Sequence, residues 1–161
     1  MSGIISDNVG RSSGLVKAAG GGGKVLQVVE GELTTEASSS ATTYQAGGLT
    51  VDITPSATSS KVLVFTSFSG SASVNTEETS YTIYRDSTNL AAEGAGSETV
   101  LVTIGNPSNI IAPINMQALD SPSSTSALTY EVYYKSTGGD SVAYVNKDAT
   151  LAKITVMEIG A

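Results

Sequence analysis

Apolar and polar residues alternate over short stretches of the chain, and this pattern predicts β-strands from residue 24 onward. The clearest case is a stretch in which Leu49, Val51 and Ile53 alternate with polar residues and Pro55 follows. A period of two residues is that of a strand with one face buried. Residues 61–68 begin instead with a continuous apolar run, which is typical of a central strand covered on both faces.

Similar stretches are separated by segments that contain Gly, Pro, Asp or Ser, residues that favour turns. We expect further strands at residues 24–29, 79–85, 99–104, 110–119, 128–135, 141–145 and 151–159, and a polar loop through residues 38–40. No stretch favours a helix, and the connections are too short for the helical crossovers of a parallel sheet. The pattern therefore predicts an all-β fold, an antiparallel two-sheet sandwich with a jelly roll as its expected form.

The first 23 residues differ from the rest and are predicted to form an extended docking arm, with residues 24–161 forming the sandwich domain. Four consecutive glycines, residues 20–23, are typical of a flexible hinge. The arm is too apolar for a solvated linker, and segments of this kind often become ordered on a partner. Its predicted docking residues are Ile4, Ile5, Val9, Arg11, Leu15, Val16 and Lys17.

The composition excludes most enzyme chemistry. The 161 residues include no cysteine and no histidine, and only 14% are charged. The chain therefore has no disulfide, no thiolate nucleophile and no Ser-His-Asp triad, and it lacks the residues of the common zinc sites. Serine and threonine are abundant, but no base is available to activate them. We expect a structural or binding module with no catalytic residues.

Three acidic or glycine-rich features contain residue types that occur in metal, phosphate or catalytic sites. The adjacent pair Glu77 and Glu78 is expected in a solvated loop, since neighbouring residues on a strand face opposite ways. Asp140 and Asp148 could offer oxygens to calcium, but they lack the spacing of a calcium loop. Residues 20–24 resemble a phosphate-binding loop only superficially, because a strand rather than a helix follows. We therefore expect no metal site and no cofactor.

The charge is unevenly distributed. The net charge is −7, and residues 1–24 contribute +2, so the remainder carries −9. An acidic body repels nucleic acid and anionic membranes, so neither is expected as a partner. The basic arm favours an acidic protein surface, although three cations in a solvated leader could equally have no role. No secretory signal and no window of 18 apolar residues is found, so we expect a soluble product that is made in the cytoplasm.

Two features favour association with other copies of the chain. The last strand is apolar on both faces, and four tyrosines lie in two strands that are expected to be adjacent. Tyrosine is enriched at interfaces, although most such tyrosines are ordinary core and surface residues. The predicted oligomer interface consists of Tyr130, Tyr133, Tyr134, Tyr144, Val156 and Ile159.

Several segments resemble virion proteins of tailed phages that infect marine bacteria. Residues 1–17 resemble a leader of such proteins, and residues 82–90, 119–130 and 154–159 resemble their fibre and decoration modules. The resemblance implies a trimeric jelly roll, similar to the tumour-necrosis-factor/complement head, that serves as a structural part of the virion. It brings no catalytic residues. The implied partners are two further copies of the chain and a major capsid protein or a tail or baseplate protein.

Three functions are therefore candidates for this chain. The first is a capsid decoration, cement or head-fibre protein of the virion, anchored by the arm. The second is a tail-fibre or receptor-binding knob whose loops at residues 75–79 and 93–98 contact host surface glycan; these loops hold Ser, Gly and Glu rather than aromatic residues. The third is a secreted carbohydrate-processing enzyme, which the absence of His, Cys and a spaced carboxylate pair disfavours. The sequence favours the first.

Overall fold

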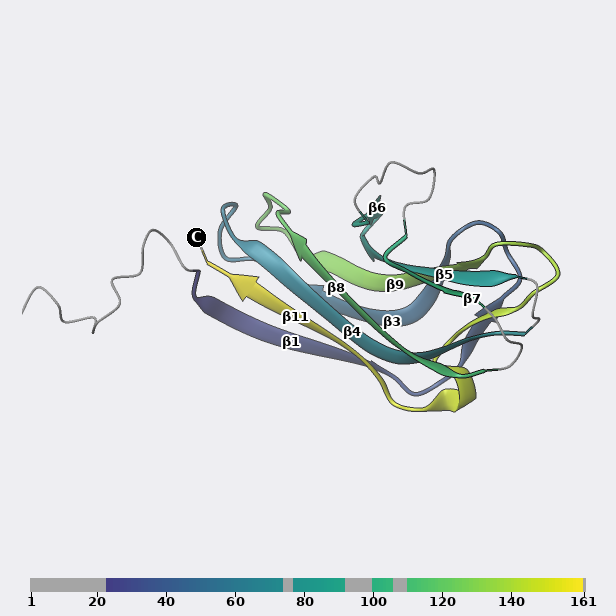
Figure 1. Ribbon diagram of the computed structural model, residues 1–161. Helices are drawn as coiled ribbons and strands as arrows, with labels where there is room; N and C mark the ends of the chain where they lie inside the picture. Colours follow the sequence, from purple (N-terminus) through teal and green to yellow (C-terminus); the bar gives the residue numbers. More distant parts are fainter. Residues whose placement is uncertain (1–22, 74–76, 92–99, 106–109, 161) are drawn as a thin grey trace, which may run out of the picture.

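The computed structural model describes residues 23–73, 77–91, 100–105 and 110–160, which form a sandwich of two antiparallel sheets (Figure 1). The strands are β1 (Val25–Leu33), β2 (Ala37–Ser39), β3 (Gln45–Ile53), β4 (Lys61–Ala72), β5 (Glu78–Arg85), β6 (Thr88–Asn89), β7 (Val102–Gly105), β8 (Ala112–Asp120), β9 (Leu128–Ser136), β10 (Ala143–Val145) and β11 (Ala152–Ile159). A single 3₁₀ turn, η1 (Lys147–Ala149), lies between β10 and β11. No helix of the described residues has the length and apolar character needed to cross a membrane.

The connectivity is that of a jelly roll, as predicted. Sheet A has six strands in the order β1-β11-β4-β10-β2, with β8 also paired to β4. Sheet B has five strands in the order β3-β9-β5-β6, with β7 also paired to β5. The long pairs β1 with β11, β3 with β9, β4 with β8 and β5 with β7 join early strands to late ones. This nested pairing wraps one long hairpin into two facing sheets.

The core lies between the sheets and follows the alternation of the sequence. In β3 the apolar residues Leu49, Val51 and Ile53 are buried, whereas the polar residues between them are exposed. Strand β11 buries Ile154 and Val156 in the same way. Because adjacent side chains of a strand point to opposite faces, each sheet contributes one face to the core.

Three predictions made for individual strands need correction. Strand β4 is central in sheet A, but it is not covered on both faces: Phe65 is 39% exposed and Leu63 is half-buried on the outer face. The expected loop at residues 38–40 begins within β2, which pairs with β10. Strand β7 begins at Val102 rather than at residue 99. The predicted arm, residues 1–23, lies outside the described residues except for Gly23.

Candidate interaction surfaces

The outer face of sheet A carries an apolar row that crosses four strands. Val28, Met157, Leu63 and Leu119 occupy successive register positions on β1, β11, β4 and β8. Val28 and Leu119 are 55% and 59% exposed. Because they share one row and one face, their side chains form a continuous apolar strip across strands spaced about 4.8 Å apart. We call these four residues the apolar row.

The apolar row lies toward the end of the sheet at which the described chain begins and ends (Figure 1). Leu26 is 50% exposed there, and the amide of Gly160 donates a hydrogen bond to the carbonyl oxygen of Lys24 at 2.8 Å. The predicted arm therefore joins the domain beside the apolar row. Ile159, one of the predicted interface residues, lies half-buried in this region.

Next to the apolar row, the same face is hollowed. The next two rows across the strands are Glu30, Thr155, Phe65 and Gln117, and then Glu32, Lys153, Ser67 and Asn115. The hollow has a volume of about 530 Å³ and is lined by Phe65, Thr66, Ser67, Asn115, Met116, Gln117, Lys153 and Thr155. Its lining thus combines one exposed aromatic ring with amide, hydroxyl and ammonium groups.

The ammonium group of this face is held between two carboxylates. Lys153 Nζ lies 2.5 Å from Glu30 Oε1 and 3.0 Å from Glu32 Oε1. The hydrogen bond from Lys153 and its positive charge lower the pKa of Glu30, and the same contacts raise the pKa of Lys153. Glu30 and Lys153 therefore both stay charged near neutral pH. The formal charges of Lys153 and the two glutamates sum to −1, so Lys153 offers no unbalanced positive charge to an anion.

The outer face of sheet B carries a cluster of aromatic rings. Tyr84 and Tyr133 are stacked with ring centroids 4.1 Å apart, and Tyr44 meets Tyr84 edge to face at 6.0 Å. The ammonium of Lys135 lies 5.2 Å from the centroid of the Tyr44 ring. All three rings are only half-buried. We call Tyr44, Tyr84 and Tyr133 the tyrosine trio.

The predicted oligomer interface is divided by the fold. Tyr130, Tyr134 and Val156 are at most 2% exposed and lie in the core, so they cannot contact another subunit. The prediction is wrong for these three, because every second residue of β9 and β11 faces the core and these three are among them. Tyr133 lies on the outer face of sheet B, whereas Tyr144 and Ile159 belong to sheet A. Whether any of them contacts a second copy stays a prediction.

The structure also contains a buried carboxylate that the sequence did not single out. Glu158 is 1% exposed, and its carboxylate accepts hydrogen bonds from the amide and hydroxyl of Ser56, the hydroxyl of Ser60 and the amide of Gln27. Burial alone would raise the pKa of Glu158, but these hydrogen bonds outweigh that effect and lower the pKa to about 2. In the sequence, Glu158 follows Ile154 and Val156 at intervals of two residues. This spacing is the only feature of the sequence that predicts an inward-facing side chain for Glu158.

A second charged cluster joins the two sheets. Arg85 on β5 donates to both carboxylate oxygens of Asp120 on β8, at 2.8 and 2.6 Å, and the hydroxyl of Tyr130 on β9 donates to the same carboxylate at 2.7 Å. Burial lowers the pKa of Arg85, but the hydrogen bond and charge of Asp120 raise it above its ordinary value. Burial and the adjacent Asp120 raise the pKa of Tyr130. The cluster is saturated with internal contacts, which gives it a structural role.

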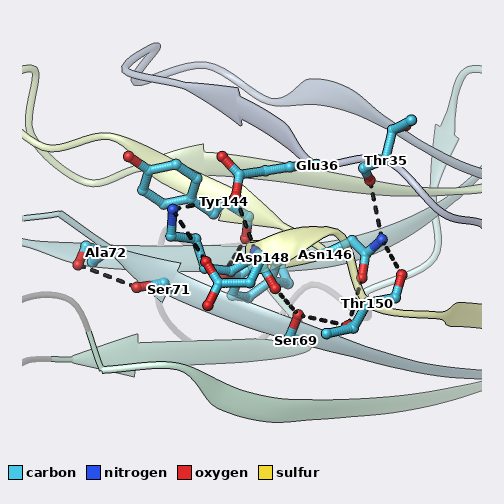
Figure 2. Close-up of polar contacts among 11 residues, drawn as sticks. Thr35, Glu36, Ser69, Ser71, Ala72, Tyr144, Asn146, Asp148 and Thr150 are labelled. Carbon is cyan, nitrogen blue, oxygen red and sulfur yellow. Dashed lines mark hydrogen bonds and ion pairs between the residues drawn. The ribbon is translucent and has the colours of Figure 1, made fainter.

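The turn that contains Asp148 is also held by internal contacts (Figure 2). Asn146 is buried, and its backbone adopts the left-handed conformation. Its side-chain amide donates hydrogen bonds of at most 3.1 Å to the carbonyl oxygens of Leu33, Thr35 and Thr150. The amide of Asp148 donates to Glu36 at 3.0 Å. No group of three or more acidic side chains that could hold a metal ion occurs in the described part of the chain.

Glu77 does not lie in a solvated loop as expected. Its carboxylate accepts hydrogen bonds from the amides of Asp140 and Ser141 and from the hydroxyl of Ser136. It thereby fixes the connection between β9 and β10. Glu78 opens β5 and is exposed, and its carboxylate lies beside Gly105, whereas that of Glu77 lies beside Gly138. The arrangement suits support of a loop and leaves no paired carboxylates for acid–base work at this position.

No family model and no curated protein matches this chain. Among solved structures, VP2 of infectious bursal disease virus in a subviral particle aligns with a TM-score of 0.37 and 14% identity, over 86% of this chain and 38% of that one. A structure of the Gt strain of infectious bursal disease virus aligns with a TM-score of 0.35 and 15% identity, over 86% and 39%. This chain thus spans less than half the length of either protein.

Proposed function

We propose that this chain is a non-enzymatic structural virion protein of a tailed phage, a trimeric capsid decoration or head-fibre subunit anchored by its N-terminal arm. The observation that carries the proposal is the apolar row, which places exposed aliphatic side chains on an outer sheet face. A sandwich whose outer faces meet only water presents polar residues there. The assignment to a tailed phage is supported by the resemblance to phage virion proteins in residues 1–17, 82–90, 119–130 and 154–159.

The arm and the apolar row would form one continuous docking surface. The predicted arm is apolar and enters the domain at Lys24, next to Leu26 and Val28, which are half exposed. A major capsid protein or a tail or baseplate protein that bound the arm would therefore also cover this end of sheet A. Burial of these aliphatic side chains would hold the subunit on the particle, because apolar burial contributes roughly 25 cal/mol per Å².

We propose the opposite face, at the tyrosine trio, as the trimer contact. Stacked, half-buried tyrosines supply a large contact area with little side-chain entropy to lose, and they are enriched at subunit interfaces. Tyr133 of the predicted interface belongs to this cluster. With the trimer contact on sheet B and the particle contact on sheet A, the two associations would not compete for one surface.

Light scattering of the purified full chain tests the trimer. We expect the mass of three chains at micromolar concentration, and the mass of one chain for the double variant Tyr84→Ala and Tyr133→Ala. Leu151→Ala is the matched control, because it removes an exposed apolar side chain that lies outside both the tyrosine trio and the predicted interface, and it should leave the mass unchanged. A monomeric wild-type chain, or a trimer in the double variant, would contradict this contact.

Electron microscopy of phage particles labelled against the chain tests its place in the virion. We expect label distributed over the capsid, and less label for a chain that carries Val28→Ser and Leu119→Ser. Label confined to the tip of the tail would favour a receptor-binding knob instead. Particles that carry no label at all would contradict a virion role.

A further inference from the structure

The hollow on the outer face of sheet A has the chemistry of a ligand site. Phe65, which lines the hollow, is 39% exposed. Asn115 and Gln117 on β8 and Ser67 on β4 are exposed beside it. Within the described part of the chain, no side-chain hydrogen bond joins these three polar residues to a partner, so their amides and hydroxyl are open to a ligand.

The groups around the hollow favour a neutral ligand that carries many hydroxyls. An amide side chain both donates and accepts hydrogen bonds, and so does a hydroxyl, which matches the mixed character of sugar hydroxyls. The ring of Phe65 offers an apolar face on which the C–H face of a pyranose can pack. A phosphate or sulfate group is disfavoured, because Lys153 is already held by Glu30 and Glu32 and the three sum to −1.

We propose that the hollow formed by Phe65, Ser67, Asn115, Gln117 and Lys153 binds a neutral oligosaccharide. Its volume of about 530 Å³ is within the range of small-molecule sites. The ring of Phe65 packs against one sugar face, and the amides of Asn115 and Gln117 bond its hydroxyls. This activity goes beyond the proposed structural role, since it gives the subunit a glycan contact on the sheet face rather than on its loops.

The test is a titration of the isotopically labelled full chain, followed by NMR, with neutral hexasaccharides of glucose, mannose, galactose and N-acetylglucosamine. A sulfated hexasaccharide serves as the anionic comparison. We expect millimolar binding of at least one neutral sugar, with amide shifts centred on Phe65 and Gln117. Phe65→Ala should weaken this binding at least tenfold. Leu119→Ala, an exposed apolar residue on the same face but outside the hollow, should not.

The double variant Asn115→Ala and Gln117→Ala tests the amides separately and guards against misfolding of the Phe65 variant. It should also lose binding while its amide spectrum stays dispersed. Absence of binding by all neutral sugars, equal binding by Phe65→Ala, or tighter binding of the sulfated sugar would each overturn the proposal. Light scattering of the same sample reports the oligomeric state independently, so failure of the trimer and failure of the sugar site are distinguishable.

Discussion

At the scale of single residues, Glu158 joins three segments that lie far apart in the sequence. Its carboxylate accepts hydrogen bonds from Gln27 on β1 and from Ser56 and Ser60 in the connection between β3 and β4. Gln27 also donates to the carbonyl oxygen of Thr54 at 2.8 Å. The buried charge is therefore satisfied entirely by neighbours that have no charge of their own, and these neighbours need a carboxylate to remain paired.

Glu158→Gln should lower the free energy of unfolding by about 2–3 kcal/mol at pH 7, because hydrogen bonds to a buried charge are lost. The pKa of Glu158 is lowered from its ordinary value of 4.5 to about 2, so the stabilisation is present above pH 4.5 and is lost as the pH falls toward 2. Urea unfolding at several pH values checks this. The difference between wild type and variant should shrink over that window; a constant difference would contradict the role of the charge.

Gly31 is needed because β1 approaches β3 closely. A Cβ atom at this position would overlap the carbonyl oxygen of Thr50 and lie 3.1 Å from a methyl of Ile154. Since the overlap is with backbone, Gly31→Ala should cost about 1–3 kcal/mol of stability. Thermal unfolding measures it. Gly139→Ala is the control, because no atom lies within 4 Å of its added Cβ; an equal loss in both variants would contradict the steric argument.

At the scale of elements, Asp120 connects the end of β8 in sheet A with β5 and β9 in sheet B. Asp120→Ala should lower the free energy of unfolding by about 3 kcal/mol, because it leaves Arg85 and the hydroxyl of Tyr130 without their shared partner. Glu32→Ala removes an exposed ion pair and should cost no more than about 1 kcal/mol. Chemical denaturation compares the two. Equal costs would show that the cluster does not join the sheets energetically.

Strand positions could be read from the sequence more reliably than contacts between strands. The alternation of Leu49, Val51 and Ile53 predicts a strand and the face that it buries, as the structure confirms. The same alternation places Tyr130 and Tyr134 on one face and Tyr133 on the other, so a strict period would have separated them. Grouping them by residue type alone produced the mistaken interface.

The hollow and the Glu158 site depend on which residues of neighbouring strands pair with one another, and a single sequence does not show this pairing. The hollow requires Phe65, Gln117 and Thr155 to lie in one row across three strands that are distant in the chain. Glu158 likewise depends on a loop 98–102 residues away. Alternation indicates that these side chains share a face, but it does not indicate which strands are neighbours.

At the scale of the whole molecule, the charges of the predicted arm and its aliphatic residues favour different partners. Residues 1–24 carry +2 and the remainder carries −9, so the arm is attracted to its own domain. Exposed ion pairs contribute only about 0.2–1 kcal/mol each and are weakened by salt. The aliphatic residues of the arm have no such preference for the acidic domain. They favour any apolar surface against which they can be buried. Ion pairs weaken as salt rises, whereas apolar burial does not, so the salt dependence of attachment shows which of the two holds the subunit.

We therefore expect the aliphatic residues of the arm to anchor the subunit and Arg11 to orient it. Replacing Ile4 and Leu15 by Ser should lower occupancy on particles more than replacing Arg11 and Lys17 by Ser, since apolar burial contributes roughly 25 cal/mol per Å² and exceeds two exposed ion pairs. Quantitative labelling of particles at low and high salt measures both effects, and wild-type attachment should persist at high salt. If moderate salt released the wild-type chain while the Ile4 and Leu15 variant stayed bound at low salt, electrostatic attraction rather than the aliphatic residues of the arm would be the anchor.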